Sequence, residues 1–334
     1  MDRRAALGVA LAAGACTVGG RRLATSSLDE RLSGDIAPVH DPCIIRQGDT
    51  YHLFCTGHLG RGAGVLPWRT SPDLVHWSDN GSVFDALPDW AEREVPGTSG
   101  IWAPDISYRD GRYHLYYALS TFGKNRSTIG LASTPTLDRR DRQFGWRDDG
   151  VVIRSQPGDD YNAIDPNLAV DADGRPWLVF GSFWSGIKLV ALDPATGKPA
   201  PHADLISLVR RPTTPDAVEA PFIIRRGGFF YLFAAFDFCC RGADSSYYTV
   251  VGRSDRIDGP YRDRAGRAML EGGGTTVLLA SPGQRFAGPG HPAILHDGDR
   301  FLIVYHAYDT QAHGTPTLRI QPLGWTSDGW PVAQ

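Results

Sequence analysis

A hairpin pattern that returns five times is the feature that most constrains this fold. Each copy has a Pro-containing start, a short apolar strand, a turn and a second apolar strand. The copies begin near residues 41, 105, 165, 220 and 291, about 60 residues apart. A single hairpin cannot bury its apolar face in water, so the five copies must share a core. The sequence therefore predicts an all-β fold, a five-bladed β-propeller with the first strand of each hairpin innermost.

The length and composition fit one large domain. The chain has 334 residues, of which 39 are glycine and 24 are proline, as expected for many short strands and turns. Propellers of this length fold as single domains, so we predict that residues 26–334 form one propeller. The formal net charge is −3 and no long basic run is present, which argues against a nucleic acid partner. We expect a monomer.

The first 25 residues carry an export pattern. A charged start with Arg3 and Arg4 is followed by an Ala/Leu/Val run that is too short to span a bilayer. We predict that residues 1–25 form a signal peptide and that the mature protein is secreted or periplasmic. The paired arginines are compatible with a twin-arginine signal. The alternatives are a lipidated Cys16, which would attach the protein to a membrane, and a disordered N-terminus without an export role.

Four cysteines follow this segment. Cys43 and Cys55 lie on opposite arms of the first hairpin, where a disulfide and two buried free thiols are both compatible with the sequence. Cys239 and Cys240 are adjacent, a spacing that suits neither a zinc site nor a CxxC redox site.

Three carboxylates fall at the predicted channel rim. Asp41, Asp165 and Glu219 lie directly before or near a proline that opens an apolar strand. One Asp-Pro pair alone would indicate only a strand-entry turn, but burying three acids close together costs stability and is not needed for packing. Clustered carboxylates are typical of glycoside hydrolysis, in which one acid protonates the leaving oxygen and another activates water or attacks carbon. Trp102 and Trp184, in loops beside Ser and Gly, are the best candidates for a platform under a sugar ring.

The motifs around these residues resemble a known family. The resemblance is carried by SGIWAPDI at 99–106, YNAIDPNL at 161–168, GSFWSGIKL at 181–189, VEAPFIIRRGGFFYLF at 218–233, FDFCCRG at 236–242 and GPGHPAI at 288–294. With these motifs the chain resembles glycoside hydrolase family 43, and its endo-arabinanase branch most of all, from about residue 36 onward. This resemblance implies a five-bladed propeller and an inverting hydrolase that cuts internal α-1,5-L-arabinofuranosidic bonds of arabinan, a side chain of pectin.

The resemblance also implies roles for particular residues. Asp41 would be the general base, Glu219 the general acid and Asp165 the group that orients the acid and tunes its pKa. His291 would hold one mostly water-coordinated calcium ion in the channel, although Pro292 stands where we expect a small or polar residue. The implied sugar contacts, together with the proposed Trp102 platform, are Asp41, Trp102, Gly123, Asn162, Ala163, Ile164, Asp165, Ser182, Phe183 and Trp184.

The predicted geometry supports this division of roles. Acids on blades one and four can stand on opposite sides of a ring, with room for sugar and water between them. Blade three lies next to blade four, so the negative charge of Asp165 would keep Glu219 protonated. Three other functions stay open: an exo-acting α-L-arabinofuranosidase or β-xylosidase, a non-catalytic carbohydrate-binding propeller and a structural interaction propeller.

Overall fold

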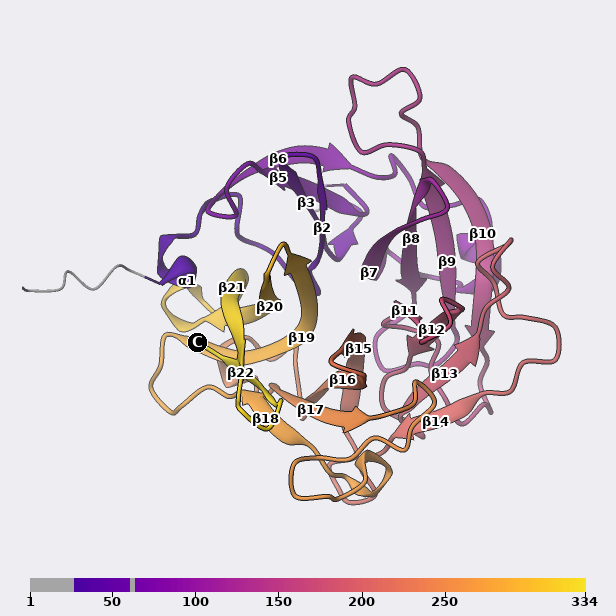
Figure 1. Ribbon diagram of the computed structural model, residues 1–334. Helices are drawn as coiled ribbons and strands as arrows, with labels where there is room; N and C mark the ends of the chain where they lie inside the picture. Colours follow the sequence, from indigo (N-terminus) through magenta and orange to yellow (C-terminus); the bar gives the residue numbers. More distant parts are fainter. Residues whose placement is uncertain (1–26, 61–63) are drawn as a thin grey trace, which may run out of the picture.

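The computed structural model describes residues 27–60 and 64–334, and it confirms the five-bladed propeller. The predicted signal segment and Cys16 lie outside these residues. Five separate sheets surround a common axis (Figure 1). The innermost strands are β2, β7, β11, β15 and β19, and each contacts the next around the ring, with β19 returning to β2. The first strand of each predicted hairpin is therefore innermost, as expected.

The strands of each blade follow one another along the chain, except that the short β4 of blade 2 lies between β3 and β5 of blade 1. Blade 1 contains β1 (Ser33–Gly34), β2 (Cys43–Gln47), β3 (Thr50–Phe54), β5 (Pro67–Ser71) and β6 (His76–Ser82). Blade 2 contains β4 (Gly57–His58), β7 (Gly100–Arg109), β8 (Arg112–Leu119), β9 (Ser127–Thr134) and β10 (Arg147–Ser155). Blade 3 contains β11 (Asn167–Val170), β12 (Pro176–Phe180), β13 (Ile187–Ala191) and β14 (Ile206–Val209).

The last two blades are four-stranded. Blade 4 contains β15 (Val218–Arg226), β16 (Phe229–Phe236), β17 (Tyr248–Ser254) and β18 (Thr275–Leu278). Blade 5 contains β19 (Phe286–Asp297), β20 (Arg300–Asp309), β21 (Thr315–Trp325) and β22 (Pro331–Ala333). The helices are short: α1 (Leu28–Arg31), α2 (Ala91–Glu94), η1 (Gly242–Asp244), η2 (Met269–Glu271) and η3 (Thr310–Ala312). None of these described helices has the length and apolar content needed to cross a membrane.

Tight turns set the register of the hairpins. In blade 2, Arg109 pairs with Arg112, so the connection is only two residues long. Those two residues, Asp110 and Gly111, have φ angles of 51° and 76°. Positive φ at both central positions gives the turn whose twist matches that of the flanking strands.

The core consists of layers between neighbouring blades, because side chains alternate along each strand. In β3, Leu53 packs in the cluster shared with blade 5, whereas its neighbour Phe54 packs in the cluster shared with blade 2. The same alternation places Tyr231 between blades 4 and 5 and Phe230 between blades 4 and 3. Strands buried on both faces explain why the hairpins read as nearly continuous apolar runs.

This alternation also determines whether Cys43 and Cys55 can form a disulfide. Cys43 pairs with Phe54 across the hairpin, so Cys55 is one residue out of register with it. The two side chains therefore belong to opposite faces of the sheet, Cys43 toward blade 2 and Cys55 toward blade 5. Both are buried free thiols, and no disulfide joins them.

An N-terminal arm, residues 27–39, joins the first blade to the last. Its β1 pairs in parallel with β6 at the outer edge of blade 1. Asp29 of α1 forms a buried ion pair with Arg319 of β21 and accepts a hydrogen bond of 3.1 Å from the N–H of Ile320. The N–H of Leu318 donates to the carbonyl of Ile36 at 2.8 Å. The arm therefore connects blades 1 and 5 where the ring closes.

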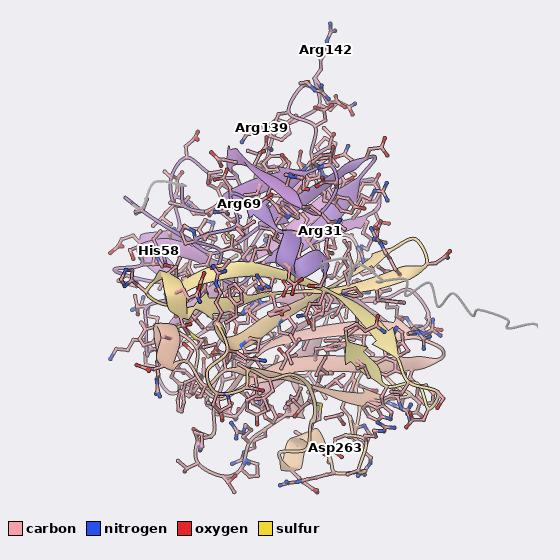
Figure 2. The ribbon with its side chains drawn as sticks, turned by 90° about the vertical axis from the view of Figure 1, so that its left-hand side faces the viewer. Arg31, His58, Arg69, Arg139, Arg142 and Asp263 are labelled. Atoms are coloured by element: carbon pink, nitrogen blue, oxygen red, sulfur yellow. A yellow bond between two sulfur atoms is a disulfide. The ribbon has the colours of Figure 1, made fainter. Side chains whose placement is uncertain are left out.

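The longest excursions leave the outer strands. Figure 2 shows the molecule from the side, with Arg142 and Asp263 at opposite ends. Arg142 lies between β9 and β10 of blade 2, and Asp263 lies between β17 and β18 of blade 4. Both loops therefore project away from the axis of the ring.

Candidate active site

One unusual backbone conformation recurs at the same end of all five inner strands, which we call the rim. The residues that adopt it are Asp41, Ala103, Asp165, Ala220 and His291, each directly before a proline and each with φ between 39° and 56°. Positive φ is uncommon for residues other than glycine, and a residue before proline normally prefers an extended conformation. The pairing of the inner strand with its neighbour shifts register at this point in blades 2, 4 and 5. Pro292 is thus the blade 5 counterpart of a proline that follows this position in every blade.

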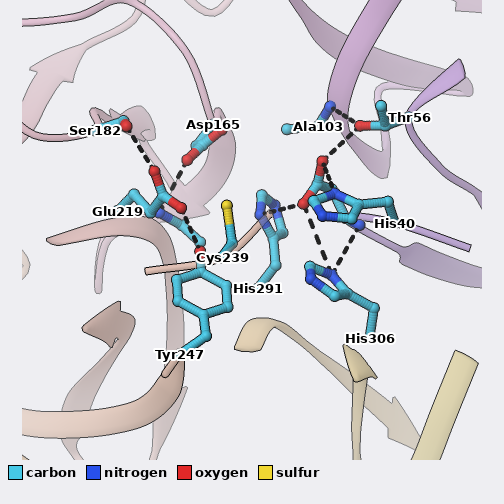
Figure 3. Close-up of polar contacts among 12 residues, drawn as sticks. His40, Thr56, Ala103, Asp165, Ser182, Glu219, Cys239, Tyr247, His291 and His306 are labelled. Carbon is cyan, nitrogen blue, oxygen red and sulfur yellow. Dashed lines mark hydrogen bonds and ion pairs between the residues drawn. The ribbon is translucent and has the colours of Figure 1, made fainter. Parts of the chain in front are cut away.

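In blades 2, 4 and 5 these shifts are bulges, which re-aim side chains. Blades 1, 3 and 5 use the position for Asp41, Asp165 and His291, which meet near the axis (Figure 3). Blades 2 and 4 have alanine there, and blade 4 supplies Glu219 from the preceding residue. The predicted convergence of the four polar residues is therefore found in the structure.

Asp41 lies among imidazoles. Its Oδ1 is 3.0 Å from Nδ1 of His291, and its Oδ2 is 2.8 Å from Nδ1 of His40. The hydroxyl of Thr56 donates to Oδ2 at 2.6 Å, and the N–H of Asp41 donates to Nδ1 of His306 at 3.1 Å. We call this set of groups the base side.

The base side favours an ionised Asp41. Burial alone would raise the pKa of Asp41, but the charges and hydrogen bonds of His40 and His291 hold it well below its usual range. Asp41 is thereby kept ionised and able to accept a proton.

Glu219 lies among hydroxyls. Ser182 donates to its Oε2 at 2.7 Å, and Tyr247 donates to its Oε1 at 2.8 Å. The neighbouring Asp165 accepts a hydrogen bond of 3.1 Å from the N–H of Ala220, the residue after Glu219. We call Glu219, Asp165, Ser182 and Tyr247 the acid side.

The acid side favours a bound proton. Burial raises the pKa of Glu219, against the opposing effect of hydrogen bonds from Ser182 and Tyr247. Burial also raises the pKa of Asp165 well above its usual range, and the charge of Glu219 adds to that shift. Because the two carboxyls interact, they titrate as a pair that resists losing its last proton.

A further buried carboxylate, Asp105, lies behind the rim. It accepts hydrogen bonds from Nδ2 of Asn167 at 3.1 Å and from the N–H of Leu168 at 2.8 Å. The carbonyl oxygen of the same Asn167 side chain accepts from the N–H of Ile223 at 2.9 Å. Burial raises the pKa of Asp105 to about 7. The chain of contacts ties blades 2, 3 and 4 together beneath the acid side.

The residues expected to contact sugar fall into two groups. Trp184 is 38% exposed, and Gly123 is exposed on the loop after β8. Phe183 and Trp102 are half-buried, and Trp102 lies edge-on to His58. These four residues are available to a ligand, whereas Ser182 is buried and contacts Glu219.

The other group lies below the surface. Asn162 is buried and accepts a hydrogen bond of 2.7 Å from Ser127. Ala163 is fully buried and Ile164 is nearly so, with 0% and 7% exposure. The turn before Asp165 packs against blade 2. Ser182 and Asp165 are buried to a similar extent, so sugar contact by these three residues stays a prediction.

The residues around His291 fit only a metal ion that keeps most of its water. Nδ1 of His291 faces Asp41, which leaves Nε2 for an ion. Burial opposes protonation of His291, but Asp41 and the carboxylates of Asp165 and Glu219 raise its pKa to about 9. In the described part of the chain, the clusters of three or more possible ligands do not include His291. Calcium takes roughly six to eight oxygen ligands, so these residues do not enclose a calcium site.

Several members of the site were not predicted from the sequence. Thr56 lies just after β3 of blade 1, and Tyr247 precedes β17, where it reads as an ordinary apolar position. Tyr308, in β20, has its hydroxyl 2.8 Å from Nε2 of His40 and 3.2 Å from Nε2 of His306. His306 and Tyr308 belong to the motif HAYD, in which polar residues end an apolar strand, a local signal that Thr56 and Tyr247 lack.

Comparisons with known proteins cover nearly all of this propeller. The model of glycosyl hydrolases family 43 matches residues 36–331. The extracellular endo-alpha-(1->5)-L-arabinanase 1 of Bacillus subtilis is 44% identical over 295 residues, 88% of this chain and 87% of that protein. The extracellular exo-alpha-(1->5)-L-arabinofuranosidase ArbA of Cellvibrio japonicus is 41% identical over 305 residues, covering 88% and 85%. The solved family 43 endo-arabinanase from Bacillus licheniformis is 47% identical with a TM-score of 0.83, covering 90% of this chain and 99% of that one.

Proposed function

The chain belongs to glycosyl hydrolases family 43, and we propose that it cleaves internal α-1,5-L-arabinofuranosidic bonds of arabinan by an inverting mechanism. The observation that carries the proposal is the contrast between two buried carboxylates. The pKa of Asp41 is held low by its histidines, whereas burial raises the pKa of Glu219. A pair with opposite protonation supplies one base and one acid, as hydrolysis with inversion requires.

In this proposal Asp41 takes a proton from the attacking water. Its anionic form is stabilised by His40, His291 and Thr56, and these contacts fix the carboxylate in place. Glu219 gives its proton to the leaving glycosidic oxygen. Ser182 and Tyr247 hydrogen-bond to both oxygens of Glu219, so the carboxyl is oriented before the substrate binds.

Asp165 is the positioning residue of the acid side. It accepts from the N–H of Ala220 and so fixes the backbone that carries Glu219. It also makes complete ionisation of the pair unfavourable. A calcium ion is proposed to bind through Nε2 of His291 and water. When bound, it would supply positive charge among the carboxylates.

The endo mode of action is supported by similarity and by one cleft. A cleft of about 420 Å³ borders Tyr247 and is also lined by Ser245, Gly288 and Thr310. Tyr247, the partner of Glu219, is the member of the acid side that lines it, so we propose that it receives sugar residues beyond the one at the carboxylates. The exo-acting alternative is favoured by the 41% identity to the relative from Cellvibrio japonicus.

Export of the protein is part of the proposal. The relatives from Bacillus subtilis and Cellvibrio japonicus are named extracellular, and the sequence begins with the export pattern described above. N-terminal sequencing of protein recovered outside the cell should find residues 1–25 removed. Extracellular protein that still begins at Met1 would contradict the signal.

Product analysis is the experiment that tests the activity. Linear arabinan, debranched arabinan and an aryl arabinofuranoside are incubated with enzyme, and products are followed by chromatography together with viscosity. We expect viscosity to fall before much free arabinose appears. Release of arabinose alone from the first minutes would move the assignment to the exo-acting alternative. NMR observation of the newly formed sugar anomer tests inversion.

A further inference from the structure

Cys239 and Cys240, adjacent in the chain, are joined by a disulfide at the rim. Figure 3 shows Cys239 between Glu219 and His291, with its sulfur directed toward the space between acid side and base side. The side chain of Cys240 is exposed, and that of Cys239 is half-buried. The disulfide therefore borders the place where a sugar must lie if Glu219 and Asp41 act on it.

Contacts on both flanks fix the disulfide against the catalytic candidates. On the acid side, Cys239 packs against the cluster that contains Ala220 and Tyr247. On the base side, Sγ of Cys240 is 3.8 Å from Nε2 of His40, and the N–H of Cys240 donates to the hydroxyl of Tyr308 at 2.8 Å. Tyr247 contacts Glu219, and His40 contacts Asp41. The disulfide therefore touches a residue that positions each of the two carboxylates.

The rest of the loop continues the same surface. Phe238 precedes the disulfide, and its ring lies 6.1 Å from that of Phe183. The guanidinium of Arg241, which follows the disulfide, lies 4.0 Å over the ring of Phe238. The loop is closed by Ser246, whose N–H donates to the carbonyl of Phe238 at 3.0 Å. An apolar strip, Phe183–Phe238–disulfide, thus runs along one side of the candidate site.

We propose that the Cys239–Cys240 disulfide is a substrate-contacting wall that determines how tightly the sugar chain binds. The proposal rests on the proposed function and names a further binding element of that site. Sulfur is polarisable and makes favourable apolar contacts, which suits the C–H faces of a furanose. The link between neighbours closes a small covalent ring, so both side chains are ordered before the sugar arrives. Preordering reduces the entropy lost on binding.

Reduction removes this wall without removing atoms of the catalytic groups. A phosphine such as TCEP attacks the exposed disulfide and breaks the S–S bond. The phosphine is oxidised to its oxide with oxygen from water, and the two sulfurs each gain a proton and become thiols. The freed side chains then rotate independently, so substrate binding must order them again.

The test is kinetics of wild-type enzyme on linear arabino-oligosaccharides before and after TCEP treatment. We expect KM to rise about fivefold, the factor for losing contact with roughly 40 Å² of apolar surface. We expect kcat to change less than about twofold, because a wall touches ground state and transition state alike. Thiol titration of unfolded protein establishes that the disulfide has opened, and reoxidation should restore KM.

The double variant Cys239→Ala/Cys240→Ala is the matched control. It should have the raised KM of reduced wild type and should not respond to TCEP, which excludes an effect of the reagent elsewhere. Circular dichroism checks its fold, and Cys239→Ser/Cys240→Ser replaces it if it does not fold. An unchanged KM in fully reduced wild type would overturn the proposal, as would a loss confined to kcat. Absence of arabinan hydrolysis before reduction would overturn the proposed function and this inference together, whereas hydrolysis with a KM independent of reduction would overturn only the inference.

Discussion

Asp41 and Glu219 are buried to the same extent, with 9% and 8% of their surfaces exposed, and their pKa values move in opposite directions. Burial therefore does not distinguish them. Asp41 is surrounded by imidazoles that can carry positive charge, whereas Glu219 is surrounded by neutral hydroxyls and another carboxyl. The comparison teaches that the neighbours on each side of the ring, not the depth of the carboxylate, assign base and acid.

Removal of Asp41 should have the largest effect and tests its role as the base. Every substrate needs an activated water, so Asp41→Ala should lose activity on arabinan and on an activated aryl arabinofuranoside alike, by about 10²–10⁴-fold. The measurement is kcat/KM on both substrates, with circular dichroism as the control for folding. A well-folded variant with near wild-type rates would remove Asp41 from the role of base.

Removal of Glu219 should reduce activity on the two substrates to different extents. Glu219→Ala should lose about 10²–10⁴-fold on arabinan, whose leaving oxygen needs a proton. It should lose much less on an aryl substrate whose leaving group departs without protonation. Equal losses on both substrates would mean that Glu219 is not the acid.

Asp165→Asn tests whether Asp165 affects the protonation of Glu219 within the acid side. The substitution removes one carboxyl of the interacting pair and preserves its shape, so Glu219 should lose its proton at lower pH. The alkaline limb of the pH–rate profile should then move to lower pH, and kcat on arabinan should fall about tenfold or more. An alkaline limb that stays in place would show that Asp165 does not act on Glu219.

Tyr247→Phe should shift the same limb the other way. The hydrogen bond from Tyr247 favours ionised Glu219 and lowers its pKa. Its loss should raise that pKa and move the alkaline limb to higher pH by up to about one unit. Thr56→Val, which removes the hydroxyl that donates to Asp41, is the matched change on the base side and should leave this limb in place. Parallel shifts in both variants would contradict the separation of the two sides.

Metal removal should have the smallest effect. If an ion binds at His291, a chelator should lower the melting temperature by about 2–4 °C, since a bound ligand stabilises only the folded state. Elemental analysis of wild type and His291→Ala measures the ion directly. Active wild-type protein without bound metal would end the calcium proposal.

The fold and the main carboxylates were predictable because they repeat. Five hairpins with a proline at the same point place Asp41, Asp165 and His291 at one rim, whatever the details of packing. The left-handed backbone at these positions was not predictable, because a residue before proline ordinarily extends. In blades 2, 4 and 5 that conformation coincides with a bulge against the neighbouring strand, which the local sequence does not encode.

The partners of the acids were harder to predict because they come from distant strands. Tyr308 reaches His40 across 268 residues, and no local pattern marks that contact. Cys43 and Cys55 illustrate the same limit at short range. Their state depends on a register shift of one residue, which turns the second side chain to the other face of the sheet. Burial of Ala163 likewise follows from packing against blade 2, which the motif around Asp165 does not encode.

The contacts of the N-terminal arm can form only after the last blade has been synthesised. Asp29 is synthesised 290 residues before Arg319, yet the two form one buried contact. A contact between such distant residues is slow to form. The arm must therefore wait, unattached on one side, until blade 5 has been made. A chain truncated before β21 would have most of its blades but not the contact between the N-terminal arm and blade 5. Its unpaired strand edges would be exposed to proteases and to other chains.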